Sequence, residues 1–106
     1  MNEASLWRLV ETECPRQQFP IAARVDAAGN LRDSRGQAGE LGDLAAYVRE
    51  LAQLVGGELG LGRFIGLQSI DAEEQIVIGA DQNGELLAVR GPRHAPATAL
   101  CRLLDL

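Results

Sequence analysis

The stretch GELGDLAAYVRELAQLVGGELGL, residues 39–61, decides the fold of this chain. Its apolar residues recur at the i, i+3, i+4, i+7 spacing of a helix that faces a core. Tyr47 and Leu54 widen this apolar surface to about 180°, whereas an ordinary surface helix needs only about 100°. We therefore expect one long helix that covers its own sheet with one side and packs on a second protein surface, in a dimer, with the other. The residues of the apolar repeat are Leu41, Leu44, Ala45, Val48, Leu51, Ala52, Val55 and Leu59.

The chain before this helix is expected to form one short helix and two strands. Residues 3–14 have helical spacing, and Pro15 ends that helix because its ring lacks an N–H donor. Apolar and other residues alternate over 21–25, which predicts a half-buried strand. Residues 26–30, DAAGN, are typical of a turn. The polar segment at 31–33 then returns as a strand at an exposed sheet edge.

Three apolar runs follow the long helix, at Phe64–Ile70, Ile76–Ala80 and Leu86–Val89. The connections between them are too short for parallel crossovers, so the runs predict an antiparallel meander. The Asn-Gly pair at 83–84 is typical of a hairpin turn. A final helix is expected over residues 96–104, where a proline suits the first turn.

The size and composition fit one α+β domain of residues 1–106 with the element order α-β-β-α-β-β-β-α. The chain is 46% hydrophobic, enough for a single core. A net charge of −5 argues against nucleic acid and anionic membranes, which both attract basic surfaces. The N-terminus has no secretory signal pattern, and no apolar run approaches the roughly 20 residues of a membrane span. These features predict a cytoplasmic protein in which Cys14 and Cys101 are buried or half-buried free thiols.

No group of residues has the spacing that catalysis or metal binding requires. The glycine-rich segment 60–66 leaves a helix and enters a strand, whereas a phosphate loop leaves a strand and opens a helix. The acidic segment 71–74 lacks the alternating ligands of a calcium loop. The two cysteines lack the basic neighbours that generate a reactive thiolate. We expect no catalytic residue, no metal and no cofactor.

The region around the only histidine leaves two interpretations open. His94 is flanked by Arg90 and Arg93. A general base needs a nearby nucleophile or an orienting carboxylate, and no adjacent residue supplies either. The segment is therefore either a solvated loop or a small cationic contact for an acidic partner.

The element order resembles that of the roadblock/dynein light chain family, as does segment 39–62 leading into the meander. Bacterial members are most similar, since such a helix there precedes a strand resembling Phe64–Ile70. Their next hairpin carries a short acidic or Asn-Gly turn, like Asp81–Gly84 here. The chain departs from the family pattern in its first two strands, which carry Arg24 and the charged segment 32–35. These departures concern the surface with which family members face a partner GTPase more than they concern the fold.

The resemblance implies a five-stranded antiparallel sheet with the central helix on one face and both terminal helices on the other. It also implies a homodimer formed by the central helix, Gly39–Leu59, and the next strand, Arg63–Asp71. Family members regulate or scaffold small Ras-like GTPases and motor complexes, and they are generally not enzymes. We therefore expect a non-catalytic homodimeric regulator or adaptor of a Ras-like GTPase. The expected interface residues are Leu44, Tyr47, Val48, Leu51, Leu54 and Phe64.

Two other interpretations are open. A secretion chaperone is also small, acidic and dimeric, but it has three strands before its main helix. Residues 19–35 have room for only two, at about 3.3 Å per residue. A small-ligand sensor of profilin or PAS-like shape needs aromatic and polar groups around a pocket, and only 4% of this chain is aromatic.

The helix register also makes a mutational prediction. Leu51→Asp should dissociate the dimer or unfold the chain, because a buried unpaired carboxylate is costly. Arg49→Asp, on the expected polar side of the helix, should do neither.

Overall fold

The computed structural model describes residues 3–60, 64–81 and 83–103, and it contains the predicted elements in the predicted order. Leu61, Arg63 and Leu104, at the ends of predicted elements, lie outside the described residues. Two strands precede the long helix, as expected for this fold and unlike the chaperone alternative. The elements are α1 (Glu3–Glu13), β1 (Ile21–Val25), β2 (Leu31–Arg35), α2 (Gly39–Leu59), β3 (Gly66–Ile70), β4 (Glu74–Ala80), β5 (Leu86–Pro92) and α3 (Thr98–Leu103).

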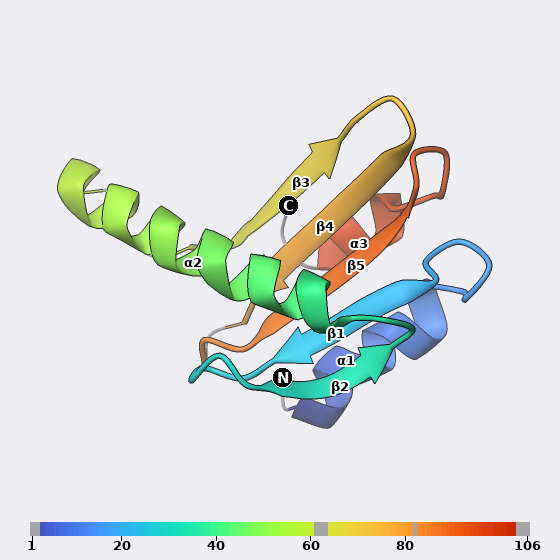
Figure 1. Ribbon diagram of the computed structural model, residues 1–106, viewed down its shortest axis with the longest axis horizontal. Coiled ribbons are helices and arrows are strands. Elements are labelled where there is room, and N and C mark those ends of the chain that lie inside the picture. The colour runs from blue at the N-terminus through green and yellow to red at the C-terminus, as the bar shows by residue number, and fades with distance from the viewer. Residues whose placement is uncertain (1–2, 61–63, 82, 104–106) are drawn as a thin grey trace.

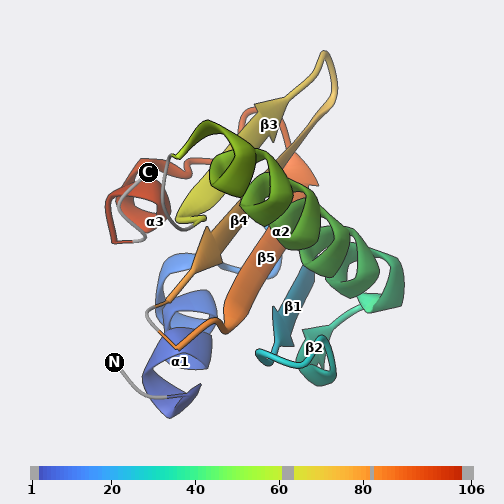
Figure 2. The ribbon, with the colours of Figure 1, turned by 90° about the vertical axis from the view of Figure 1, so that its left-hand side faces the viewer.

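The five strands form one antiparallel sheet in the order β2-β1-β5-β4-β3. Helix α2 crosses one face of this sheet, and α1 and α3 lie on the opposite face (Figures 1 and 2). The arrangement implied by the family resemblance is thus confirmed. Strands β2 and β3 are the two edges, which also confirms that the polar second strand lies at an edge.

The alternation of side chains along the strands divides the core into two layers. On β5, Leu87 and Val89 point toward α1 and α3, whereas Leu86 and Ala88 point toward α2. The layer under α1 and α3 contains Val10, Cys14, Phe19, Ala22, Val77, Leu87, Val89, Ala95, Ala97 and Leu100. The layer under α2 contains Val25, Leu41, Ala45, Ile78, Leu86 and Ala88.

Strand β1 is buried on both faces, so the prediction of a half-buried strand is wrong. Ala22, Ala23, Arg24 and Val25 are all buried. The reason is the strand order: β1 lies between β2 and β5, where α2 covers one face and α1 with its following segment covers the other. Alternating polarity in the sequence cannot show that the second face is also covered.

Two turns at one end of the sheet are built in the same way. The carboxylate of Asp26 accepts the backbone N–H groups of Ala28 and Asn30, and a glycine with φ 92° follows Ala28. The carboxylate of Asp81 accepts the N–H groups two and four residues later, with Gly84 at φ 83°. Both predicted turns are therefore confirmed.

The segment between α1 and β1 lies very close to β5. A Cβ atom on Gly91 would lie 2.1 Å from the carbonyl oxygen of Gln18, so only glycine fits there without a backbone shift. None of the helices in the described ranges combines the length and the hydropathy that a bilayer crossing requires.

Candidate functional site: an open apolar surface

The orientation of α2 follows from what its two flanks contact. Leu41 and Ala45 are buried against the sheet. Gly42 lies against the side chains of Leu31 and Val25, so its flank faces β2 and β1. At 100° per residue the opposite flank therefore faces β4 and β3. Figure 1 shows that the C-terminal half of α2 extends past the strands.

The flank of α2 that faces β4 and β3 is apolar and open. Leu44, Leu51 and Val55 follow one line along the helix, at i, i+7 and i+11, with Tyr47 and Leu54 next to them on the outer side. On the sheet, Leu67 pairs with Ile78 and so points to the α2 face. These side chains are between 40% and 65% exposed. We call this set the open apolar surface: Leu44, Tyr47, Leu51, Leu54, Val55, Leu59, Ile65 and Leu67.

The surface is open because α2 does not cover the whole sheet. Its main contacts are with β1, β5 and β2. The α2 face of β3 is thereby left uncovered. The open flank of α2 and the α2 face of β3 meet there at an angle and form an apolar corner. A second apolar element can pack into this corner.

The six expected interface residues divide into two groups. Leu44, Tyr47, Leu51 and Leu54 are exposed. Val48 and Phe64 are half-buried and pack against the core layer under α2, so they form the inner wall of the corner. Ile65 and Leu67 were not identified individually from the sequence. Their alternation with Gly66 and Gln68 places them on one face of a strand, and this pattern could have identified them.

Arg49 is buried, so its expected place on the polar side of α2 is wrong. Its side chain is directed toward the β1–β2 and β4–β5 turns, because it follows Gly42 by seven residues and shares that flank. The guanidinium donates to the carbonyl oxygens of Asp26, Ala27 and Gly84, the first two at 3.5 and 3.3 Å. Arg49 thus attaches α2 to both turns and cannot serve as a neutral control.

Two further arginines that depart from the family pattern support the fold. Arg24 on β1 forms ion pairs with Asp33 on β2 and with Glu85, the latter at 3.0 Å. Arg35 on β2 donates to the carbonyl oxygens of Val10, Cys14 and Phe19, so it binds the C-terminal end of α1. Sequence reasoning did not assign these roles, since the partners lie far apart in the chain.

The three basic side chains around the only histidine have different surroundings. Arg90, on β5, forms a two-bond ion pair with Glu74 at 2.7 and 2.9 Å, and this pairing lowers the pKa of Glu74. Arg93 and His94 are exposed. The charge of Arg90 is therefore neutralised locally, and Arg93 and His94 are left as the exposed part of the predicted cationic contact.

The two cysteines are free, one buried and one half-buried, as predicted. Cys14 has a basic neighbour after all, because Arg35 binds its carbonyl oxygen. Burial nevertheless raises the pKa of the Cys14 thiol to about 11, against the opposing effect of Arg35. Within the described ranges no three His, Cys, Asp or Glu side chains are grouped so that they could hold a metal ion.

Comparison with solved structures gives this arrangement a name. The chain is similar to the Roadblock/LC7 domain from Streptomyces avermitilis, with a TM-score of 0.74 and 19% identity over 99% of this chain and 90% of the other. It is also similar to Myxococcus xanthus MglB, with a TM-score of 0.70 and 19% sequence identity over 92% of this chain and 80% of the other. For an MglB with tetrameric arrangement the TM-score is 0.71, with 19% sequence identity over 99% of this chain and 85% of the other. No protein-family model and no curated protein sequence matches the chain. The chain therefore has the fold of the roadblock/LC7 domain.

Proposed function

We propose that this chain is a non-catalytic homodimeric regulator or adaptor, and that the open apolar surface is the interface between its two copies. The observation that carries the proposal is the size and continuity of that surface, which joins one flank of α2 to the uncovered part of the sheet. Contiguous exposed apolar surface of this kind marks a protein–protein interface in soluble proteins.

The shape of the surface favours a second copy as the occupant. A two-fold symmetric dimer needs a surface that is complementary to itself. Here the protruding flank of α2 with Leu51 fits the corner lined by Val48 and Phe64 in the other copy, and the reverse contact forms at the same time. Apolar side chains supply this contact, so the residues of the open apolar surface bring no charge into it.

The outer side of α2 carries the charges that keep a dimer soluble. Asp43 and Glu50 are exposed there, and Arg49, the one basic residue of the helix, is bound to backbone carbonyls instead. The outer side is therefore acidic, in line with the net charge of −5. This charge supports a protein partner rather than a nucleic acid, since phosphates require basic surfaces.

We propose a Ras-like small GTPase in the cytoplasm as the protein partner. The support is the resemblance of segment 39–62 and the meander to a family of GTPase regulators, together with the fold shared with MglB structures. The dimer surfaces that remain free for the GTPase include the outer side of α2 and the α1 and α3 face of the sheet.

Isothermal titration tests the GTPase assignment. Purified chain is titrated with Ras-like GTPases encoded near its gene, each loaded with GDP or with a non-hydrolysable GTP analogue. We expect saturable binding to at least one GTPase with a preference for one nucleotide state, and no nucleotide hydrolysis by the chain alone. Absence of binding to every GTPase in both states would overturn the GTPase assignment and leave the dimer proposal standing.

A further inference from the structure

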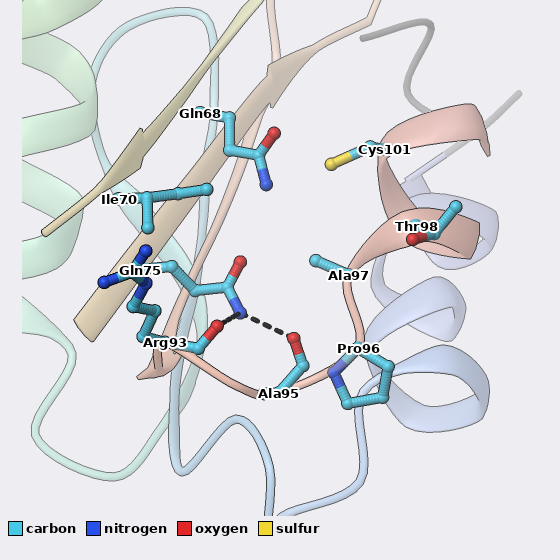
Figure 3. A pocket seen from close by; sticks show the side chains of 9 residues that line it. All are labelled: Gln68, Ile70, Gln75, Arg93, Ala95, Pro96, Ala97, Thr98 and Cys101. Carbon is cyan, nitrogen blue, oxygen red and sulfur yellow. Dashed lines mark hydrogen bonds between the residues drawn. The ribbon is translucent and has the colours of Figure 1, made fainter. Parts of the chain in front are cut away.

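A second candidate site lies on the other face of the sheet, between the edge strand β3 and α3 (Figure 3). A cavity of about 510 Å³ opens there. Gln68 and Ile70 of β3 form one wall, since Gln68 pairs with Val77 and so points to the α1 and α3 face. Ala97 and Thr98, at the start of α3, form the opposite wall. The volume lies within the range of ligand sites in proteins, about 300–1,000 Å³.

The floor of this cavity presents a hydrogen-bond acceptor in a fixed orientation. Gln75 is only 3% exposed, and its Nε2 donates to the carbonyl oxygens of Ala95 at 2.6 Å, Pro92 at 3.2 Å and Arg93 at 3.3 Å. These bonds hold the amide group in one orientation. Figure 3 shows Oε1 directed into the space between Gln68 and Ala97. Within the described residues, no hydrogen bond reaches this oxygen. In the same residues, every fully buried polar side-chain atom has a hydrogen-bond partner. Oε1 is therefore not fully buried, and it is accessible from the cavity.

The edge of the cavity presents a guanidinium without an ion-pair partner in the described part of the chain. Arg93 is exposed, whereas its backbone is fixed by Gln75 and by an N–H bond to the carbonyl of Glu73 at 2.9 Å. Asp71 is the acidic group that interacts electrostatically with it. Oδ1 of Asp71 accepts the N–H groups of Glu73 and Glu74, and within the described residues the Asp71 carboxylate forms no ion pair with Arg93. Arg93 is thus positioned to bind an anion from outside.

We propose that this cavity binds an extended peptide segment that carries a carboxylate. One peptide N–H donates to Oε1 of Gln75, and the carboxylate pairs with Arg93. The Gln68 amide, which both donates and accepts, matches the neighbouring peptide group, while Ile70 and Ala97 contact an apolar side chain. The cavity lies next to the edge strand β3, so an extended chain can run alongside this strand, between β3 and α3.

This inference does not depend on the proposed dimer or GTPase. The cavity faces α1 and α3, whereas the open apolar surface faces α2, so the sheet separates the two sites. Peptide binding and dimer formation can therefore be measured independently on the same sample.

Nuclear magnetic resonance titration of the ¹⁵N-labelled full chain tests the proposal with three acetylated peptides. The first, acetyl-Ala-Val-Ala, has a free C-terminal carboxylate. The second, acetyl-Ala-Asp-Val-Ala-amide, has a side-chain carboxylate only, and the third, acetyl-Ala-Val-Ala-amide, has none. We expect saturable shifts of the Gln68 and Gln75 side-chain amide signals and of the Thr98 backbone signal with the first or the second peptide. Which of the two binds more tightly identifies the source of the carboxylate.

A charge reversal provides the matched control. Arg93→Glu should weaken binding about tenfold or more, because it replaces a charge-assisted hydrogen bond by a repulsion. Arg32→Glu, on the opposite sheet edge, should leave binding unchanged. The proposal is overturned if neither carboxylate peptide gives saturable shifts at millimolar concentration. Equal binding of the third peptide, or unchanged affinity in a folded Arg93→Glu variant, would overturn it as well.

Discussion

Arg24, Arg35 and Arg49 are buried, and the latter two bind backbone carbonyl groups. Arg35 connects edge strand β2 to the end of α1, and Arg49 connects α2 to two turns. The long aliphatic stem packs within the fold while the guanidinium donates several hydrogen bonds to backbone carbonyl groups of neighbouring segments. Helical periodicity alone places such a charged residue on the solvent side of the helix, whereas here its role is structural.

Removal of the Arg49 guanidinium should destabilise the chain. Arg49→Met keeps the stem but leaves the carbonyls of Asp26, Ala27 and Gly84 without this donor, which costs about 1–3 kcal/mol. Urea unfolding followed by circular dichroism should show that decrease. The neighbouring variant Glu50→Gln, at an exposed position, should stay within about 0.5 kcal/mol of the parent. Equal stability of the two variants would mean that the Arg49 contacts contribute nothing.

The loss of folding stability at acidic pH should depend in part on the turn between β3 and β4. Hydrogen bonds from the N–H groups of Glu74 and Glu73 lower the pKa of Asp71 below its ordinary value of 3.8. The unfolded chain then binds this proton at a higher pH than the folded chain. The stabilisation is therefore complete above pH 3.8 and is lost as the pH falls through the folded-state pKa.

The variant Asp71→Asn tests this origin of acid sensitivity, since it cannot take up the proton. Its melting temperature should decrease less than that of the parent between about pH 5 and pH 3. Asp43→Asn, which removes an exposed carboxylate on α2, should keep the parental pH dependence. Thermal unfolding at several pH values measures both, and parallel curves for parent and Asp71→Asn would contradict the assignment.

At the scale of elements, the sequence predicted much of the fold and only part of the site. The 3.6-residue period of 39–61 and the short connections of the meander are local signals, so α2 and strands β3–β5 could be predicted. Which side chains of α2 are buried depends on where the helix crosses the sheet. Val48 and Phe64 were therefore grouped with the exposed Leu51, although they line the inner wall. The cavity around Gln75 combines β3, β4 and α3, and no local pattern predicts that combination.

The flank of α2 allows a sharper mutational test than the one expected from the sequence. Leu51→Asp should shift the chain toward monomer by at least about tenfold in dissociation constant, because it places a carboxylate in an apolar interface. Gln53→Asp adds the same charge to the same helix on the flank away from the open apolar surface, and it should leave the dimer intact. Sedimentation velocity measures both variants, and equal dissociation would mean that a different surface forms the dimer.

At the scale of the whole molecule, the two faces of the sheet carry different features. Helix α2 covers part of one face and exposes an apolar corner, while α1 and α3 cover the other face and leave the cavity next to β3. Two copies joined through the corner would present two outer sides of α2 and two such cavities. Regulation of a partner by such an assembly requires no catalytic group, only surfaces held in a fixed arrangement.

The mass of the chain in solution tests the central claim most directly. Light scattering after gel filtration, over a dilution series at micromolar concentration, should give about twice the 11.4 kDa of one chain. The mass should fall toward one chain only at the lowest concentrations, as expected for a reversible dimer. A mass of 11.4 kDa at every concentration would contradict the dimer, and with it the role assigned to the open apolar surface.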